Sequence, residues 1–338
     1  MRQPKVAPLL PLLLALAFFL PVALAGRTLL VAGAFLVEFL TDGRPALLTH
    51  VTRQPRREPL PVAGVSADRY AAPALRAGVP LVLVHGFTPE GKDDPRAGQA
   101  ARLLARAGFE VAVPSLPGLM RGRLRPKDVE PVVATIAAAS ARSARSVVVM
   151  GVSVGAGPAL LAAADPRVRD RVATVVSLGG YASALELLRF FLTGGYAYDD
   201  VRGHVVHDPE VVRAFIAANA DLIDEPTRRA LSARDPARTA AFLRHPPPDL
   251  RGLLDALSPE RVASDIRARL LLVHGREDRA VPYTETLRLA AARPLRTRVL
   301  LLGIVDHVEG PGSRLGWRQL GDLLALWTAV YGLQMTRD

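Results

Sequence analysis

The stretch from Ser146 to Leu161, SVVVMGVSVGAGPALL, constrains the fold of this chain more than any other. The β-branched and apolar run at 147–150 predicts a buried strand, and the small residues that follow predict a helix packed close against it. Gly151 and Gly155 remove Cβ atoms that would clash in a sharp turn, and Ser153 would lie at the strained centre of that turn with its hydroxyl exposed. The alternative is a glycine-rich strand–helix turn in some other α/β fold, so the rest of the chain must supply partners for Ser153.

Strand and helix patterns alternate on both sides of this stretch. Predicted strands cover residues 79–84, 109–114, 147–152, 172–178, 268–273 and 297–302, and predicted helices cover 95–107, 127–140, 157–164, 284–292 and 317–331. Strands that alternate with helices indicate a mostly parallel central sheet with helices on both faces. The sequence therefore predicts an α/β fold.

The alternation stops between Ala182 and Ile266, where the sequence shows helical patterns and no strand-like run. An interruption of about 85 residues is too long for a loop in a compact domain. We interpret it as an inserted helical cap, residues 183–266, between two parts of the core, residues 41–182 and 267–338, after an N-terminal segment of residues 1–40. The first two strands are expected at 46–51 and 61–70, with a turn at 56–58.

The N-terminus carries a long apolar stretch. Residues 6–26 contain no charge, and one helical crossing of a bilayer takes about 20 residues. Arg2 and Lys5 favour an N-terminus on the cytoplasmic side. We therefore expect a membrane anchor that leaves the catalytic domain outside the cytoplasm; the alternative is a signal peptide cleaved near 22–25 and a secreted protein. A second apolar run, 28–40, is expected to lie at the membrane interface through one face, made of Leu29, Leu36, Phe39 and Leu40.

The composition excludes several classes of protein. The formal net charge of +11 comes almost entirely from arginine, but the arginines are scattered and form no basic helix, so no nucleic acid is expected as a partner. The absence of cysteine excludes thiol catalysis, disulfides and thiolate metal sites. His204, His207 and Asp208 have the spacing of a metal site but lack a second group of ligands. We expect them on a polar surface, with no metal and no cofactor.

Four motifs lie at the C-terminal ends of predicted strands. They are His85-Gly86 after the third strand, GVSVG at 151–155 after the fifth, HGREDRAVP at 274–282 after the penultimate strand, and Asp306-His307 after the last. Through these motifs the chain from Leu81 to its end resembles the α/β-hydrolase superfamily, particularly its esterase, lipase and dienelactone-hydrolase-like members. The resemblance implies the α/β-hydrolase fold with a cap. The sequence departs from the family pattern at Val152, where histidine, phenylalanine or tyrosine is more usual.

The resemblance also implies a catalytic triad in the order serine, acid, histidine, formed by Ser153, Asp278 and His307. Elimination among the seven histidines supports His307, the only one in a loop just past the final strand. Asp278 would accept the Nδ1–H of His307 and stabilise the imidazolium that forms during attack. Its rivals are Glu277, one residue off the pattern, and Asp306, which adjoins the histidine.

The remaining parts of the expected site are an oxyanion hole and a substrate pocket. The backbone N–H groups of Phe87 and Val154 are expected to form the oxyanion hole, and Gly86 lets the backbone approach the substrate oxygen. The apolar lining of the pocket is expected from Tyr181, Phe190 and Phe191.

Together these expectations describe a membrane-anchored serine hydrolase that cleaves a small-molecule carboxylic ester through an acyl-enzyme. An amidase or peptidase of the same fold is one alternative, although no β-propeller precedes the domain in this sequence, which argues against the oligopeptidase branch. A non-catalytic, membrane-anchored binding protein that retains the fold is the other.

Overall fold

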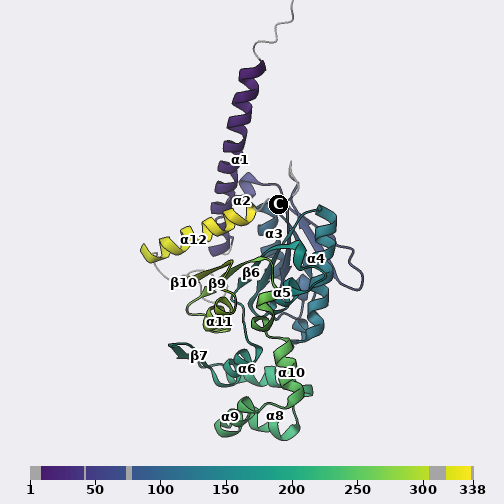
Figure 1. Ribbon diagram of the computed structural model, residues 1–338, viewed down its shortest axis with the longest axis vertical. Coiled ribbons are helices and arrows are strands. Elements are labelled where there is room, and N and C mark those ends of the chain that lie inside the picture. Colours follow the sequence, from purple (N-terminus) through teal and green to yellow (C-terminus); the bar gives the residue numbers. More distant parts are fainter. Residues whose placement is uncertain (1–8, 42, 74–77, 304–316, 336–338) are drawn as a thin grey trace, which may run out of the picture.

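A computed structural model describes residues 9–41, 43–73, 78–303 and 317–335 of the chain (Figure 1). Within these residues eight strands form one sheet in the order β1-β2-β4-β3-β5-β6-β9-β10. The strands are β1 (Arg56–Pro59), β2 (Ala67–Ala71), β3 (Val79–Val84), β4 (Phe109–Pro114), β5 (Val147–Val152), β6 (Val172–Leu178), β9 (Arg269–Gly275) and β10 (Thr297–Leu302). The six strands β4, β3, β5, β6, β9 and β10 pair in parallel, and β1 and β2 are antiparallel at one edge. The predicted mostly parallel sheet is confirmed.

Helices cover both faces of the sheet (Figure 1). Helices α4 (Val129–Ser143), α5 (Ala156–Ala164) and α11 (Thr284–Ala292) pack on one face, and α1 (Leu9–Leu40), α3 (Pro95–Arg106) and α12 (Trp317–Gln334) pack on the other. The side chains of β9 alternate accordingly: Leu270 and Leu272 belong to the first core, and Leu271 and Val273 belong to the second. Burial on both faces explains why these strands read as continuous apolar runs.

The C-terminal ends of the central strands meet at one edge of the sheet. The register pairs Val84 with Gly151, Val152 with Leu178, and Leu178 with Val273. The residues that follow β3, β5, β6 and β9 therefore lie side by side, which is where ligands bind in parallel α/β sheets.

The cap segment, residues 183–266, lies at one end of the molecule, at the bottom of Figure 1. It contains α6 (Ala184–Thr193), β7 (Gly195–Tyr198), β8 (Val201–His204), α7 (Pro209–Ala218), α8 (Glu225–Ser232), α9 (Pro236–Arg244) and α10 (Pro248–Ala256). The expectation of no strand here is wrong, because β7 and β8 form an antiparallel hairpin with Asp199 at φ 51° in its two-residue turn. Strands of four residues are too short to give a periodic signal.

Two local predictions before β3 are also wrong. Residues 46–51, expected as a strand, contain helix α2 (Leu47–Val51), in which Leu48 is fully buried and donates its N–H to the carboxylate of Glu38. The expected turn at 56–58 lies in strand β1, which pairs with β2 through Arg57 and Tyr70. A tertiary partner therefore overrides the weak local propensity in both places.

Helix α1 is continuous from Leu9 to Leu40, and its second half packs on the domain. Leu36 and Leu40, which we assigned to a membrane-facing side, are buried with Phe35 in the core instead. The indole N–H of Trp327 in α12 donates to the carbonyl of Leu29 at 2.9 Å. In the part of the chain whose side chains the structure describes, no helix combines the length and apolarity needed to cross a membrane.

Candidate active site

Ser153 lies in a strained turn between β5 and α5, with φ at +53°. A Cβ on Gly151 would lie 2.4 Å from Ala156 Cα, and a Cβ on Gly155 would lie 2.1 Å from the His85 carbonyl oxygen. Neither position therefore admits a side chain. The two glycines permit the close helix–strand approach, and the left-handed backbone of a non-glycine residue at this point is an observed strain at a candidate functional position.

The turn after β3 lies directly against Ser153. A Cβ on Gly86 would be 3.4 Å from Ser153 Cβ. His85 is buried, donates its Nδ1–H to the Gly86 carbonyl at 2.7 Å and accepts the N–H of Leu116 at Nε2 over 3.2 Å. Burial lowers the pKa of His85, which agrees with a neutral ring in this role. His85 therefore holds the turn in place and is not free to act as a base.

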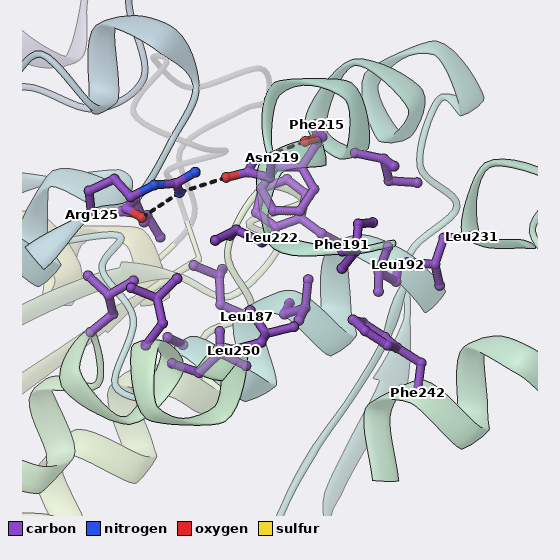
Figure 2. Close-up of a pocket in the computed structure, with 18 of the residues that line it drawn as sticks. Arg125, Leu187, Phe191, Leu192, Phe215, Asn219, Leu222, Leu231, Phe242 and Leu250 are labelled. Atoms are coloured by element: carbon purple, nitrogen blue, oxygen red, sulfur yellow. Dashed lines mark hydrogen bonds between the residues drawn. The ribbon is translucent and has the colours of Figure 1, made fainter. Parts of the chain in front are cut away.

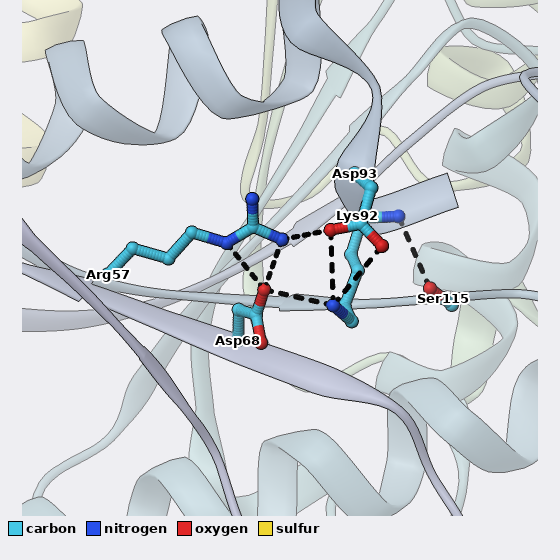
Figure 3. Close-up of polar contacts among 5 residues, drawn as sticks. All are labelled: Arg57, Asp68, Lys92, Asp93 and Ser115. Carbon is cyan, nitrogen blue, oxygen red and sulfur yellow. Dashed lines mark hydrogen bonds and ion pairs between the residues drawn. The ribbon is translucent and has the colours of Figure 1, made fainter. Parts of the chain in front are cut away.

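A group of four charged residues anchors the loop that carries Phe87 (Figure 3). Asp68 Oδ2 accepts from Arg57 Nε at 2.6 Å and from Lys92 Nζ at 3.0 Å. Asp93 contacts both cations, and the backbone N–H of Lys92 donates to Ser115 Oγ at 3.2 Å. Because Asp68 lies on β2 and Ser115 follows β4, these contacts tie the loop after Gly86 to the sheet.

Asp278 is buried in the loop after β9, with only 2% of its side chain exposed. Its Oδ1 accepts the backbone N–H groups of Ala280 at 2.8 Å and Val281 at 3.0 Å, and its Oδ2 lies 3.4 Å from His274 Nε2. The rival Glu277 is exposed. Of these two neighbouring carboxylates, only Asp278 is directed into the protein.

The loop of Asp278 is held by His274, which is fully buried. Because a carbonyl only accepts, His274 Nε2 carries the proton toward the Val281 oxygen at 2.9 Å, and Nδ1 accepts from the Thr286 hydroxyl at 2.7 Å. This pattern gives His274 a structural role in the loop of Asp278.

The described residues bring Ser153, Gly86 and Asp278 to the same edge of the sheet. Gly179 follows β6, the strand between β5 and β9, and a Cβ on it would be 3.2 Å from Asp278 Oδ2. His307 and the rival Asp306 follow β10, the neighbour of β9, and both lie outside the described residues.

Glu285 is a buried carboxylate that the sequence reasoning missed. Its Oε2 accepts the backbone N–H groups of Ala182 at 3.0 Å and Ser183 at 2.8 Å, and its Oε1 lies 3.3 Å from Arg288 Nε. It therefore ties α11 to the point where the chain leaves the sheet for the cap segment. A glutamate in the first turn of a helix is common, so only the packing distinguishes it.

Replacing Glu285 with glutamine should change how stability depends on pH. Burial raises the pKa of Glu285 above its ordinary value of 4.5, against the two N–H groups and Arg288. Because the folded state binds the proton of Glu285 more tightly than the unfolded state, protonation stabilises the fold. This contribution is complete below the unfolded pKa and is lost as the pH rises through the folded pKa. Glutamine keeps an acceptor and cannot ionise. We expect the melting temperature of Glu285→Gln to gain on the wild type as the pH rises above 4.5.

The exposed Glu277→Gln variant is the control for this pH series, because it removes a carboxylate of the same kind from solvent. Its melting temperature should follow that of the wild type at every pH. A constant difference between Glu285→Gln and wild type would contradict the role of ionisation.

An apolar cavity of about 80 Å³ lies between the cap segment and the loops that carry Phe87 and Arg125 (Figure 2). Its polar residues are Arg125 and Asn219, which are joined by a hydrogen bond of 2.9 Å from Nη1 to Oδ1. Its apolar lining comes from several helices and includes Phe87, Ala184, Leu187, Leu188, Phe191, Leu192, Phe215, Leu222, Leu231, Phe242, Leu250 and Leu254.

The three residues expected in the pocket have different surroundings. Phe191 lines the cavity, whereas Tyr181 and Phe190 are fully buried and do not. The Tyr181 hydroxyl donates to the Leu257 carbonyl at 3.1 Å, and burial raises its pKa. Phe190 packs edge-on against the imidazole of His207, with centroids 4.6 Å apart.

His204 and His207, which have the spacing of metal ligands, bind backbone carbonyls. His204 Nε2 donates to the Thr193 oxygen and His207 Nε2 donates to the Phe190 oxygen, both at 3.0 Å. Burial lowers the pKa of His207. Both rings therefore close the β7–β8 hairpin onto α6.

The chain belongs to the Alpha/beta hydrolase family, whose sequence profile matches residues 81–317. A comparison with curated protein sequences gave no match. The family assignment confirms the resemblance from which the triad and the oxyanion hole were predicted.

Two peptidase structures support the same fold. A Pyrococcus horikoshii acylaminoacyl peptidase aligns with a TM-score of 0.51 and 15% identity over 85% of this chain and 43% of its own. A Mycobacterium tuberculosis puromycin-hydrolyzing peptidase aligns with a TM-score of 0.50 and 21% identity over 86% and 40%. The chain thus spans about two fifths of the length of these peptidases. A meta-cleavage product hydrolase (CumD) from Pseudomonas fluorescens IP01 aligns with a TM-score of 0.45 and 19% identity over 83% and 97%.

Proposed function

We propose that this protein is a serine hydrolase that cleaves a carboxylic ester through an acyl-enzyme, with Ser153 as nucleophile. The observation that carries the proposal is the backbone of Ser153, held at positive φ between two glycines that admit no Cβ. Strain of this kind persists only where the surrounding structure enforces it. The contact of Gly86 with Ser153 and the burial of Asp278 at the same sheet edge support it further.

In the proposed mechanism His307 removes the proton of Ser153 as the hydroxyl attacks the ester carbonyl, and Asp278 stabilises the imidazolium. The N–H groups of Phe87 and Val154 bind the developing oxyanion, each worth about 10² to 10³ in rate. His307 then returns the proton to the leaving alcohol. Water, activated by the same histidine, hydrolyses the acyl-enzyme and frees the acid.

The apolar cavity supports a short acyl group as the part of the substrate that enters the cap segment. Its 80 Å³ is smaller than a cavity of roughly 150 Å³ that binds benzene, so it accepts only a few carbon atoms. Phe87 lies both on the oxyanion loop and in the cavity wall, which connects the reacting carbonyl to this space. A peptide would bring N–H and carbonyl groups that this apolar lining leaves unpaired.

Amide hydrolysis is the second candidate, since two structures with the same fold are named as peptidases. The test uses the purified full chain with p-nitrophenyl butyrate and butyryl p-nitroanilide. We expect the ester to turn over, with kcat/KM at least about tenfold above that of the anilide. Faster anilide cleavage would favour the peptidase, and no reaction with either substrate or with a fluorophosphonate probe would favour a non-catalytic binding protein.

Shortening a side chain of the cavity should lengthen the preferred acyl group. Leu188 lines the cavity and is partly buried. Leu188→Ala leaves space for further methylene groups, each worth about 0.8 kcal/mol when buried, or about fourfold in kcat/KM. We expect the ratio of hexanoyl to butyryl ester turnover to rise by about fourfold or more.

Leu295→Ala is the matched control for the acyl series, because Leu295 is 81% exposed and lies outside the cavity. It should leave the ratio unchanged. An unchanged ratio in Leu188→Ala as well would place the acyl group elsewhere.

We also propose that residues 6–26 anchor the protein in a membrane, with the catalytic domain outside the cytoplasm. The absence of charge in this stretch supports the anchor. In Figure 1 the first half of α1 extends away from the domain. In bacterial cells the full chain should stay with membranes after an alkaline carbonate wash, and its domain should be cut by protease added to spheroplasts.

A chain that starts at Arg27 should move to the soluble fraction in the same assay. Release of the full chain by the carbonate wash would contradict the anchor, and its secretion into the medium would favour signal cleavage.

A further inference from the structure

A second hollow, of about 800 Å³, lies against the cap segment on the side of α6 that faces away from the apolar cavity. On α6, Glu186, Arg189 and Thr193 face this hollow, whereas Leu187 and Leu188 face the cavity. The spacing of three and four residues puts each set on its own side of the helix. The hollow therefore lies mainly on the other side of α6 from the proposed acyl site, and Leu192 lines both.

Five arginines from different parts of the chain line this hollow, which we call the arginine groove. They are Arg189 on α6, Arg202 on β8, Arg234 between α8 and α9, Arg244 on α9 and Arg288 on α11. One acidic residue, Glu186, is among the lining residues. The lining thus carries five positive charges and one negative charge.

The acidic side chains nearby neutralise only two of the five arginines. Arg189 Nε lies 3.1 Å from Glu186 Oε2, and Arg288 Nε lies 3.3 Å from Glu285 Oε1. In the described part of the chain the other three, Arg202, Arg234 and Arg244, have no ion pair. Like charges around one hollow repel one another, and an anion between them relieves that repulsion.

Arg234 has an unusual backbone conformation, and Arg288 is held at the wall of the groove by its neighbours. Arg234 has φ at +56° in the link between α8 and α9, a conformation that favours glycine or asparagine over a long side chain. Arg288 donates to the Ala197 carbonyl at 3.3 Å and lies 4.8 Å above the ring of Tyr198. These contacts tie the β7–β8 hairpin to α11 and place charge at the wall of the groove before any ligand arrives.

We propose that the arginine groove binds a phosphate-bearing ligand. The planar guanidinium group pairs with two phosphate oxygens at once, and several such groups around one hollow suit a ligand with more than one anionic oxygen. The volume lies within the range of small-molecule sites, about 300 to 1,000 Å³. The ligand is a soluble phosphate compound or the headgroup of a phospholipid, which share this chemistry.

Calorimetric titration of the full chain with inorganic pyrophosphate, in micelles of a neutral detergent, tests the proposal. We expect saturable binding with a dissociation constant of about 1 mM or tighter, weakening as salt rises. Arg202→Gln/Arg244→Gln should weaken this binding at least about tenfold. Absence of saturable binding in the wild type would overturn the proposal.

The matched control is Arg213→Gln/Arg238→Gln, which removes the same charge from α7 and α9 outside the groove. It should bind pyrophosphate like the wild type, and an equal loss in both double variants would overturn the site in favour of overall charge. Displacement of pyrophosphate by micelles containing phosphatidylglycerol, but not by phosphatidylcholine, supports a headgroup as ligand; no displacement supports a soluble phosphate compound. Both double variants should fold with the melting temperature of the wild type.

Discussion

Ser153→Ala should abolish ester hydrolysis, with kcat lower by on the order of 10⁵ to 10⁶. The hydroxyl is the group that forms the acyl-enzyme, and the structure offers no second hydroxyl in the same turn. Alanine fits the position of Ser153 because it adds no atom, although it keeps the positive φ of that turn. The measurement is the turnover of p-nitrophenyl butyrate by the purified full chain, together with labelling by a fluorophosphonate probe.

The control for this variant is Ser232→Ala, at the end of α8 and far along the chain from Ser153. It should hydrolyse the ester and label like the wild type. If Ser153→Ala turned the ester over within about tenfold of the wild-type rate, Ser153 would be excluded as the nucleophile. Equal melting temperatures of the two variants would show that any loss is chemical and not a loss of fold.

Asp278→Asn should lower kcat by about 10⁴, as expected when a triad acid loses its charge. Asparagine keeps an oxygen that accepts the N–H groups of Ala280 and Val281, so the loop can keep its shape. What is lost is the negative charge that stabilises an imidazolium and selects its tautomer. The side chain is buried, so water replaces that charge poorly.

Glu277→Gln is the matched control, since it makes the same chemical change one residue earlier on an exposed side chain. We expect its kcat within about twofold of the wild type. The reverse order of effects, a large loss in Glu277→Gln and a small one in Asp278→Asn, would assign the acid to Glu277. A small loss in both would leave Asp306 as the acid.

The strands of the central sheet could be predicted from the sequence because burial on both faces makes them continuous apolar runs. The predicted bounds 79–84, 109–114, 147–152, 172–178 and 297–302 agree with β3, β4, β5, β6 and β10. The first residue of α3 could also be predicted from the sequence, because Asp94 caps the helix by accepting the N–H groups of Arg96 and Ala97.

The errors fall where a short element depends on a distant partner. Helix α2 forms under α1, where Leu48 is buried and bound to Glu38, and strand β1 forms by pairing with β2. The β7–β8 hairpin is closed by His204 and His207, which bind carbonyls of α6. Nothing in four or five residues of sequence specifies such contacts.

The sequence by itself determined the strand, turn and helix around Ser153 and the order of the motifs, because glycine spacing and strand ends are local properties of the chain. It determined the α/β class for the same reason. Only the tertiary structure decided which carboxylates are buried: Asp278 and Glu285 inside, Glu277 outside. Only the tertiary structure placed five scattered arginines around one groove. Burial and charge clustering arise from residues distant in the chain, and a sequence of this kind carries no local sign of them.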